Sequence, residues 1–349
     1  MAAVGLKSTE DSPPPNAEVS NARRPWRHDL SEAFRDPREL CRFLGLSDDV
    51  ATVAVDSTSG FPFLVPRSFA ERMQRGDPRD PLLLQVLPQA GEVGFQEGYS
   101  ADPLDESRSL KAPGLVQKYA GRALLLVTGG CAVNCRYCFR RAFPYAESGA
   151  TRSGVDAALS AIAEDPSLTE IILSGGDPLL ADDATLARII SRLDRIPHVV
   201  RLRIHTRLPV VLPSRVDAGL LDVLAATRLS RVIVIHANHP AELDATVAEA
   251  VGRLARLPAI MLNQSVLLAG VNDSVAVLRG LSERLVAIGV MPYYLHLLDR
   301  VQGAACFDVG ENLAVHLHRQ LTAVLPGYSV PKLVREIPGE PSKTWVHAR

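Results

Sequence analysis

Short apolar runs alternate with amphipathic stretches from about Thr128 onward. This alternation is typical of parallel strands that are joined by crossover helices. In the stretch 182–195, for example, apolar residues recur at helical spacing, and Asp182 or Asp183 can serve as the N-cap. The apolar runs predict six strands, at 122–130, 170–177, 198–206, 231–238, 259–270 and 290–299.

Six consecutive strand and helix units predict an α/β fold, a partial (βα)6 barrel of the TIM type rather than the closed eight-stranded form. In such barrels the chemistry lies at the C-terminal ends of the strands. The sequence follows this rule, because polar or glycine residues gather where the predicted strands end. They are Cys131, Gly175, Gly176, Asp177, Thr206, Arg207, His236, Asn238 and Asp299.

The rest of the chain divides around this barrel. Residues 1–25 are polar and proline-bearing without apolar periodicity, which predicts a disordered lead. Residues 26–118 carry helical signals broken by prolines and predict a mostly helical cap. We assign 119–325 to the barrel and 326–349 to a C-terminal loop and tail.

Composition and charge limit the cellular compartments and the binding partners that we expect for this protein. The chain has 349 residues with 38 Lys and Arg against 39 Asp and Glu, and the net charge of -1 gives no general attraction to nucleic acid or membrane. The sequence shows no apolar signal-peptide core and no run of the ~18 apolar residues that a membrane span needs. We therefore expect a cytoplasmic protein with no nucleic-acid or membrane partner.

Three of the five cysteines, Cys131, Cys135 and Cys138, fall within eight residues. A structural zinc site normally needs four protein ligands, and three thiols cannot pair among themselves as disulfides. Three thiolates can hold three irons of a [4Fe-4S] cluster and leave the fourth iron open. The alternative is that the three cysteines lie close together by chance and serve only as packed structural residues. The spacing Cys-x3-Cys-x2-Cys resembles that of the radical S-adenosylmethionine (SAM) enzymes, which implies SAM at the open iron.

Further motifs resemble the lysine 2,3-aminomutase family of radical SAM enzymes, over residues 99 to 344. That family uses pyridoxal phosphate bound through a lysine in a glycine-rich loop. Lys343 occupies such a loop here, although a lysine in a loop is by itself usually only solvated. The matching motifs are "DPLDES" (102–107), "CRYCFRR" (135–141), "HANHPAEL" (236–243), "NQSVLLAGVND" (263–273) and "PGEPSK" (338–343).

The resemblance implies a role for each candidate site residue. Glycines at a strand end can also form a simple tight turn, and a buried His or Gln can be a satisfied core residue. The distal ammonium of the substrate needs a carboxylate beside it. Glu336 stands where catabolic lysine enzymes carry an aspartate. The implied roles are cluster ligation by Cys131, Cys135 and Cys138; SAM binding by Gly175, Gly176, Asp177, His236 and Gln264; pyridoxal phosphate binding by Lys343, Arg122 and Lys118; and lysine binding by Arg140, Asp299 and Glu336.

The resemblance implies an isomerase that converts L-α-lysine to (R)-β-lysine and receives electrons from a donor such as flavodoxin or ferredoxin. Catabolic relatives continue past the pyridoxal lysine into a segment with zinc ligands, whereas "TWVHAR" follows Lys343 here and His347 alone makes no zinc site. We therefore expect no zinc, and a functional link to the ligase that attaches β-lysine to elongation factor P. A catabolic aminomutase, a radical SAM enzyme of another class and an iron-sulfur electron carrier are the alternatives.

Overall fold

Seven parallel strands form the centre of the sheet in this computed structural model, which describes residues 25–56 and 60–347. The six predicted strands are confirmed as β3 to β8, with ends that differ by up to four residues. The strands are β3 (Arg122–Thr128), β4 (Glu170–Gly175), β5 (Arg201–Thr206), β6 (Ser230–His236), β7 (Ala259–Val266), β8 (Met291–His296) and β9 (Lys332–Arg335).

Strand β9 was not predicted and falls in the stretch that we assigned to the C-terminal tail. It has four residues, too few for apolar periodicity to reveal it. The predicted cap likewise contains the hairpin β1 (Leu110–Ala112) and β2 (Leu115–Tyr119), which pairs antiparallel with β3. At the other end, β10 (Thr344–Trp345) pairs antiparallel with β9. The strand order is linear from β1 to β10, so the sheet is an open, partial barrel, as predicted.

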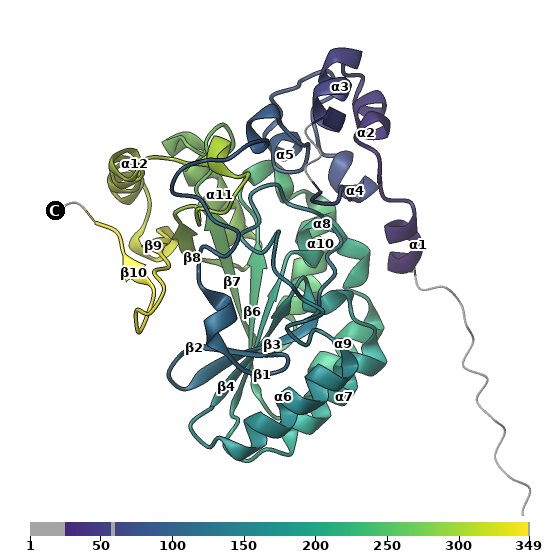
Figure 1. Cartoon of the computed structure of the whole chain (residues 1–349), viewed down its shortest axis with the longest axis vertical. Coiled ribbons are helices and arrows are strands. Elements are labelled where there is room, and N and C mark those ends of the chain that lie inside the picture. The colour runs from purple at the N-terminus through teal and green to yellow at the C-terminus, as the bar shows by residue number, and fades with distance from the viewer. Residues whose placement is uncertain (1–24, 57–59, 348–349) are drawn as a thin grey trace, which may run out of the picture.

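Amphipathic helices connect the parallel strands and cover the sheet (Figure 1). Asp182 is the N-cap of α7, since its side chain accepts a hydrogen bond from the amide of Thr185 at 2.7 Å. Asp217, Asp244 and Ser274 cap α9, α10 and α11 in the same way. These helices are α6 (Arg152–Glu164), α7 (Asp183–Asp194), α8 (Leu208–Val211), α9 (Ala218–Ala225), α10 (Ala245–Ala255), α11 (Val275–Ala287) and α12 (Glu311–Val324).

The N-terminal helices gather in one region at the upper right of Figure 1, beside one end of the strands. Proline occupies the first turn of α2 and α5, where its missing amide hydrogen costs nothing. The predicted disordered lead lies outside the described residues except for Pro25. The helices are α1 (Pro25–Ser31), α2 (Pro37–Leu44), α3 (Asp48–Asp56), α4 (Arg67–Ala70) and α5 (Pro81–Leu84).

Short 3-10 turns mark several strand ends and loops. They are η1 (Ala90–Glu92), η2 (Glu106–Ser109), η3 (Pro178–Leu180), η4 (Pro213–Arg215), η5 (Pro240–Glu242), η6 (Ala305–Phe307) and η7 (Gly327–Ser329).

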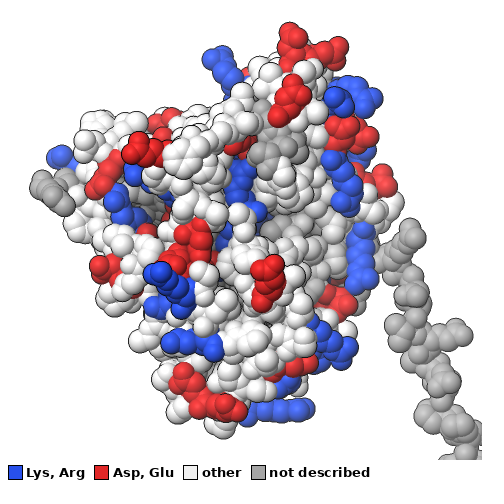
Figure 2. All heavy atoms as spheres, in the orientation of Figure 1, with Lys and Arg blue, Asp and Glu red and all other residues white. Residues whose placement is uncertain are grey.

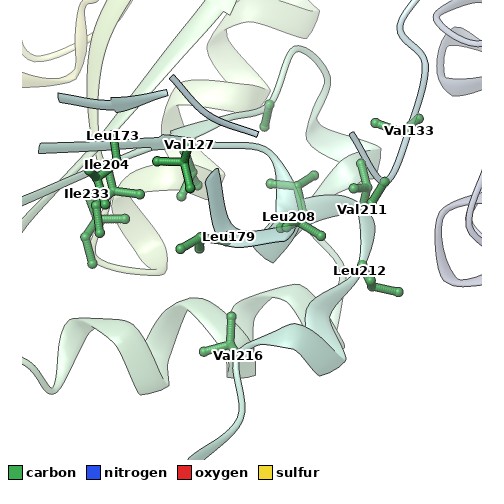
Figure 3. Close-up of a cluster of buried hydrophobic side chains, with 14 of the residues drawn as sticks. Val127, Val133, Leu173, Leu179, Ile204, Leu208, Val211, Leu212, Val216 and Ile233 are labelled. Carbon is green, nitrogen blue, oxygen red and sulfur yellow. The ribbon is translucent and has the colours of Figure 1, made fainter. Parts of the chain in front are cut away.

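The main core joins the outer face of the sheet to the loop that carries the cysteines. Leu173 of β4 and Ile204 of β5 belong to it, together with Leu208 and Val211 of α8 (Figure 3). Val133, which lies between Cys131 and Cys135, is 4% exposed and is part of the same cluster. The cysteine loop is therefore anchored in the core of the protein.

Charged side chains of both signs are interspersed over the face shown in Figure 2, without a large patch of one sign. Within residues 25–56 and 60–347, no helix combines the length and the apolar character required to cross a membrane.

Candidate active site

One cavity of about 530 Å³ opens inside the barrel at the C-terminal ends of the strands. Its wall follows the alternation of a strand, because residues two apart point to the same side of a sheet. Segments that are far apart in the sequence, such as the cysteine loop and the C-terminal loop, also line this cavity. The strand residues of β3 to β8 that line it in this alternation are Arg122, Leu124, Ile172, Ser174, Arg203, His205, His236, Gln264, Val266, Tyr294 and His296.

The three cysteines line this cavity together, and the N-terminal helical region holds their loop in place. The amide of Asn134 donates to the carbonyl of Leu64 at 3.0 Å, and the amide of Arg136 donates to the carbonyl of Gln85 at 2.9 Å. The loop is thus fixed by backbone hydrogen bonds on both sides of Cys135.

Glu92 fixes the same loop through two buried guanidinium groups. Arg136 binds both of its oxygens, with Nε–Oε1 2.9 Å, Nε–Oε2 3.0 Å and Nη2–Oε2 2.6 Å. Arg141 adds a fourth bond, Nη2–Oε2 at 2.9 Å. The side chains of Glu92 and Arg136 are 0% exposed. Sequence reasoning missed Glu92, because a single acid in a polar loop carries no pattern.

The environment of the thiols fits an iron-sulfur cluster. Burial and the neighbouring Cys135 together raise the pKa of Cys138 to about 11. The pKa of Cys131 is raised by burial and by the other two cysteines. Three thiolates this close together repel one another unless cations compensate them, and iron supplies that compensation. In the described chain no three His, Cys, Asp or Glu side chains converge on a single metal ion, whereas cluster thiolates each bind a different iron.

The glycine pair at the end of β4 allows the cysteine loop to approach closely. Gly175 has φ of +123°, and a Cβ there would lie 2.3 Å from the carbonyl oxygen of Thr128. A Cβ on Gly176 would lie 2.1 Å from the carbonyl oxygen of Gly130. The amide of Gly176 donates to Thr128 at 2.7 Å, and that of Asp177 donates to Gly130 at 2.8 Å. The glycines therefore set the position of the cysteine loop, and SAM binding by them stays a prediction.

The side chain of Asp177 makes hydrogen bonds to the turns that follow β4 and β5. Its buried carboxylate accepts hydrogen bonds from the Thr206 hydroxyl at 2.8 Å and from the amides of Arg207 and Leu208 at 2.7 and 3.1 Å. It also caps η3 through the amide of Leu179 at 3.1 Å. In this structure Asp177 positions the turn that follows β5.

A chain of five alternating charges lines the opposite part of the cavity. Lys343 pairs with Glu336, which also accepts from Lys118 Nζ at 2.7 Å. Lys118 Nζ lies 2.9 Å from Glu106 Oε1, and Glu106 binds Arg140 through Nε–Oε2 at 2.6 Å and Nη2–Oε1 at 2.8 Å. Burial opposes ionisation of Glu336, but the ammonium groups of Lys343 and Lys118 hold its pKa well below the usual range. The motif containing Glu106 was recognised, but its pairing with Arg140 was not.

Asp299 and Arg122 border this charge chain. Burial, together with the negative charge of Glu336, raises the pKa of Asp299 to about 7. The guanidinium of Arg122 lies 4.6 Å from the ring centroid of Tyr119. Both side chains line the cavity with Lys343, as the sequence led us to expect.

His236 and Gln264 are neighbours in register on β6 and β7. His236 Nε2 lies 3.1 Å from the hydroxyl of Tyr137, and burial with the nearby charge of Arg207 lowers the pKa of His236 to about 3. A neutral imidazole and an amide therefore stand side by side on the wall between the cysteines and Lys343. All the predicted site residues line one cavity, and their individual roles stay predictions.

The sequence was compared with protein families and with individual proteins, and both comparisons found radical SAM enzymes. The Radical SAM superfamily matches residues 125–252. L-lysine 2,3-aminomutase from Escherichia coli (strain K12) is 49% identical over 324 residues, which cover 93% of this chain and 94% of the relative. L-lysine 2,3-aminomutase from Haemophilus influenzae is 45% identical over 330 residues, covering 95% and 98%. Among solved structures, a radical SAM methyltransferase from Sphaerobacter thermophilus aligns with a TM-score of 0.43 and 20% identity over 63% of this chain and 68% of that chain.

The superfamily match brings with it a [4Fe-4S] cluster and SAM, as the cysteine spacing predicted. The two aminomutases are similar to this chain over nearly its full length and nearly their own. The chain therefore belongs to the L-lysine 2,3-aminomutase family of radical SAM isomerases.

Proposed function

We propose that this enzyme moves the α-amino group of L-lysine to the β-carbon with the help of pyridoxal phosphate. One observation carries the proposal: Lys343 and the three cysteines, about 200 residues apart in the chain, line the same cavity. When bound, the cluster and SAM supply a carbon radical that removes a hydrogen atom, and pyridoxal phosphate supplies a π system that stabilises the unpaired electron during the migration.

Cys131, Cys135 and Cys138 hold the cluster through their thiolates. Gly176 lets the cysteine loop lie against the end of β4, and a cluster on this loop would therefore lie next to the barrel wall. His236 and Gln264 would contact SAM from that wall. Because the pKa of His236 is low, its ring is neutral at physiological pH and offers hydrogen bonds without repelling the positive sulfonium.

Lys343 would hold pyridoxal phosphate through its amine, which must be neutral to react with the carbonyl carbon. Because Lys343 pairs with Glu336 in this structure, it would give up this ion pair and release its proton to solvent when the cofactor binds. Arg122 and Lys118 bind the phosphate, for which basic side chains are suited. Lys118 must then exchange its contacts with Glu106 and Glu336 for the phosphate, at least in part.

Arg140 binds the substrate carboxylate through its planar guanidinium. Glu106 holds that guanidinium in place in the structure described here. Asp299 and Glu336 select lysine, because an ammonium removed from water needs a carboxylate beside it. The protein contributes orientation and exclusion of water, which prevents quenching of the radical.

Mapping the pyridoxal lysine tests this function. The other lysine that could hold the cofactor is Lys332, which is exposed and whose Nζ lies 5.1 Å from the ring centroid of Trp345. Borohydride reduction followed by peptide mapping should place the pyridoxyl group on Lys343. Lys343→Arg should lose it, and the matched control Lys332→Arg should keep it. A pyridoxyl group on Lys332, or none on the cluster-loaded protein, would refute the assignment.

The (R)-β-lysine that the enzyme makes serves, in this proposal, to modify elongation factor P. The motifs at 135–141 and 335–343 resemble those of the family members that supply (R)-β-lysine to elongation factor P, which is a cytoplasmic role. The product would then pass to the ligase that modifies the factor, and flavodoxin or ferredoxin would supply electrons. Deleting the gene and weighing intact elongation factor P tests this. A factor that keeps the β-lysyl mass increment would point to catabolism instead.

A further inference from the structure

A buried arginine, Arg207, touches one of the cluster cysteines. It follows β5 directly, and its Nη1 lies 2.6 Å from Cys135 Sγ. The same Nη1 donates to the Tyr137 hydroxyl at 2.8 Å, and Nη2 donates to Gln85 Oε1 at 2.7 Å. Neither the sequence motifs nor the proposed mechanism gives this side chain a task.

The charge of Arg207 is only partly compensated. Its counter-ion is Glu242, whose Oε2 lies 3.0 Å from Nη2 and whose side chain is 0% exposed. The other oxygen, Oε1, accepts from Gln85 Nε2 at 3.1 Å and from the amides of Asn238 and His239 at 2.9 and 3.0 Å. Four donors thus share the negative charge of Glu242, and the Nη1 end of the Arg207 guanidinium faces the sulfur of Cys135.

The network also reaches the wall where SAM is expected. Asn238 Nδ2 donates to the Tyr137 hydroxyl at 2.7 Å, and that hydroxyl lies 3.1 Å from His236 Nε2. Arg207 therefore orients a cluster ligand and, through Tyr137, a residue that faces SAM. Such outer contacts commonly tune a metal site.

From this geometry we infer that Arg207 is a positioning residue that raises the reduction potential of the cluster, and that Glu242 limits the increase. The inference rests on the proposed cluster at Cys135. A low-potential donor adds one electron to the cluster, so the reduced form carries one more negative charge. A guanidinium that donates to a ligand sulfur in a buried site stabilises the reduced form more than the oxidised form.

The prediction is a pair of shifts with opposite signs. Arg207→Gln should lower the ratio of reduced to oxidised cluster about tenfold at a fixed solution potential, which corresponds to ~59 mV for one electron. Glu242→Gln should raise the ratio, because it leaves the charge of Arg207 less compensated. The control Arg188→Gln removes an arginine of α7 that pairs with Asp156 of α6. Arg188 lies outside the cavity, so the control should leave the ratio unchanged.

The measurement is a redox titration of the reconstituted protein, followed by electron paramagnetic resonance without lysine or pyridoxal phosphate. Iron and sulfide content are determined first. If the unaltered protein binds no cluster, the cluster assignment itself fails. If the variants hold a full cluster and their midpoints equal that of the unaltered protein, only the role of Arg207 fails.

Arg207→Gln leaves Glu242 buried without a cation and can lose its fold for that reason. The double variant Arg207→Gln/Glu242→Gln removes both charges and leaves two amide side chains that can hydrogen-bond to each other. It should fold, hold iron and show a midpoint below that of Glu242→Gln alone. Equal midpoints in these two variants would overturn the inference, because the only difference between them is Arg207.

Discussion

Replacing Glu92 by glutamine removes a carboxylate that joins the cysteine loop to the N-terminal helical region. Glu92 accepts four hydrogen bonds from Arg136 and Arg141, and these two side chains are 0% and 6% exposed. The variant leaves two buried guanidinium groups beside a neutral amide. Breaking a buried ion pair by removing one partner costs about 3–5 kcal/mol, so we expect Glu92→Gln to lower the free energy of unfolding by that amount.

The assay is urea unfolding of the cluster-free protein followed by far-ultraviolet circular dichroism, with variants compared at equal m values. The matched control is Glu283→Gln. Glu283 pairs with Arg279 at 2.7 Å in a surface i,i+4 pair whose side chains are 52% and 53% exposed, and its loss should cost about 0.3–0.5 kcal/mol. The reasoning is refuted if Glu92→Gln costs no more than Glu283→Gln.

Three other predictions concern the site itself. Gly176→Ala should impair cluster retention, measured as iron per chain, because the new Cβ would lie 2.1 Å from the carbonyl oxygen of Gly130; Gly252→Ala, with open space around it, should retain normal iron content. Replacing Cys131, Cys135 or Cys138 by alanine should abolish both iron retention and reductive cleavage of SAM, and normal cleavage by any one variant would contradict cluster ligation. Asp299 has a pKa of about 7, so it is neutral below that pH and ionised above it. The kcat/KM for lysine should therefore rise as the pH increases through about 7, and Asp299→Asn should flatten this limb; an unchanged profile would remove Asp299 from lysine binding.

The sequence predicted the parts of the fold that depend on local pattern. Apolar runs located β3 to β8, and the rule that chemistry lies at the C-terminal ends of strands led to the cavity. Strand β9 escaped because its four residues are too few to show a period, and β1 and β2 escaped for the same reason.

In the site, too, local motifs revealed some residues and left others unrecognised. Cysteine spacing and the family resemblance selected Cys131, Cys135, Cys138 and Lys343, and these four residues line one cavity. The partners of those residues were hidden, because a contact such as Arg207 with Cys135 joins positions 72 residues apart. Such a contact depends on how the strand is placed against the loop, which no local pattern encodes. Glu92, Glu106 and Glu242 are partners of this kind, and each is buried against an arginine.

The most direct test of the account is the fate of nitrogen in lysine labelled with ¹⁵N at the α-position. The reconstituted enzyme is incubated without oxygen with this lysine, SAM, pyridoxal phosphate and a reductant, and the amino acids are separated by chiral chromatography and analysed by mass spectrometry. We predict β-lysine that carries ¹⁵N on its β-carbon. The account is contradicted if protein with a full complement of iron and pyridoxal phosphate cleaves SAM to 5'-deoxyadenosine and still returns only α-lysine.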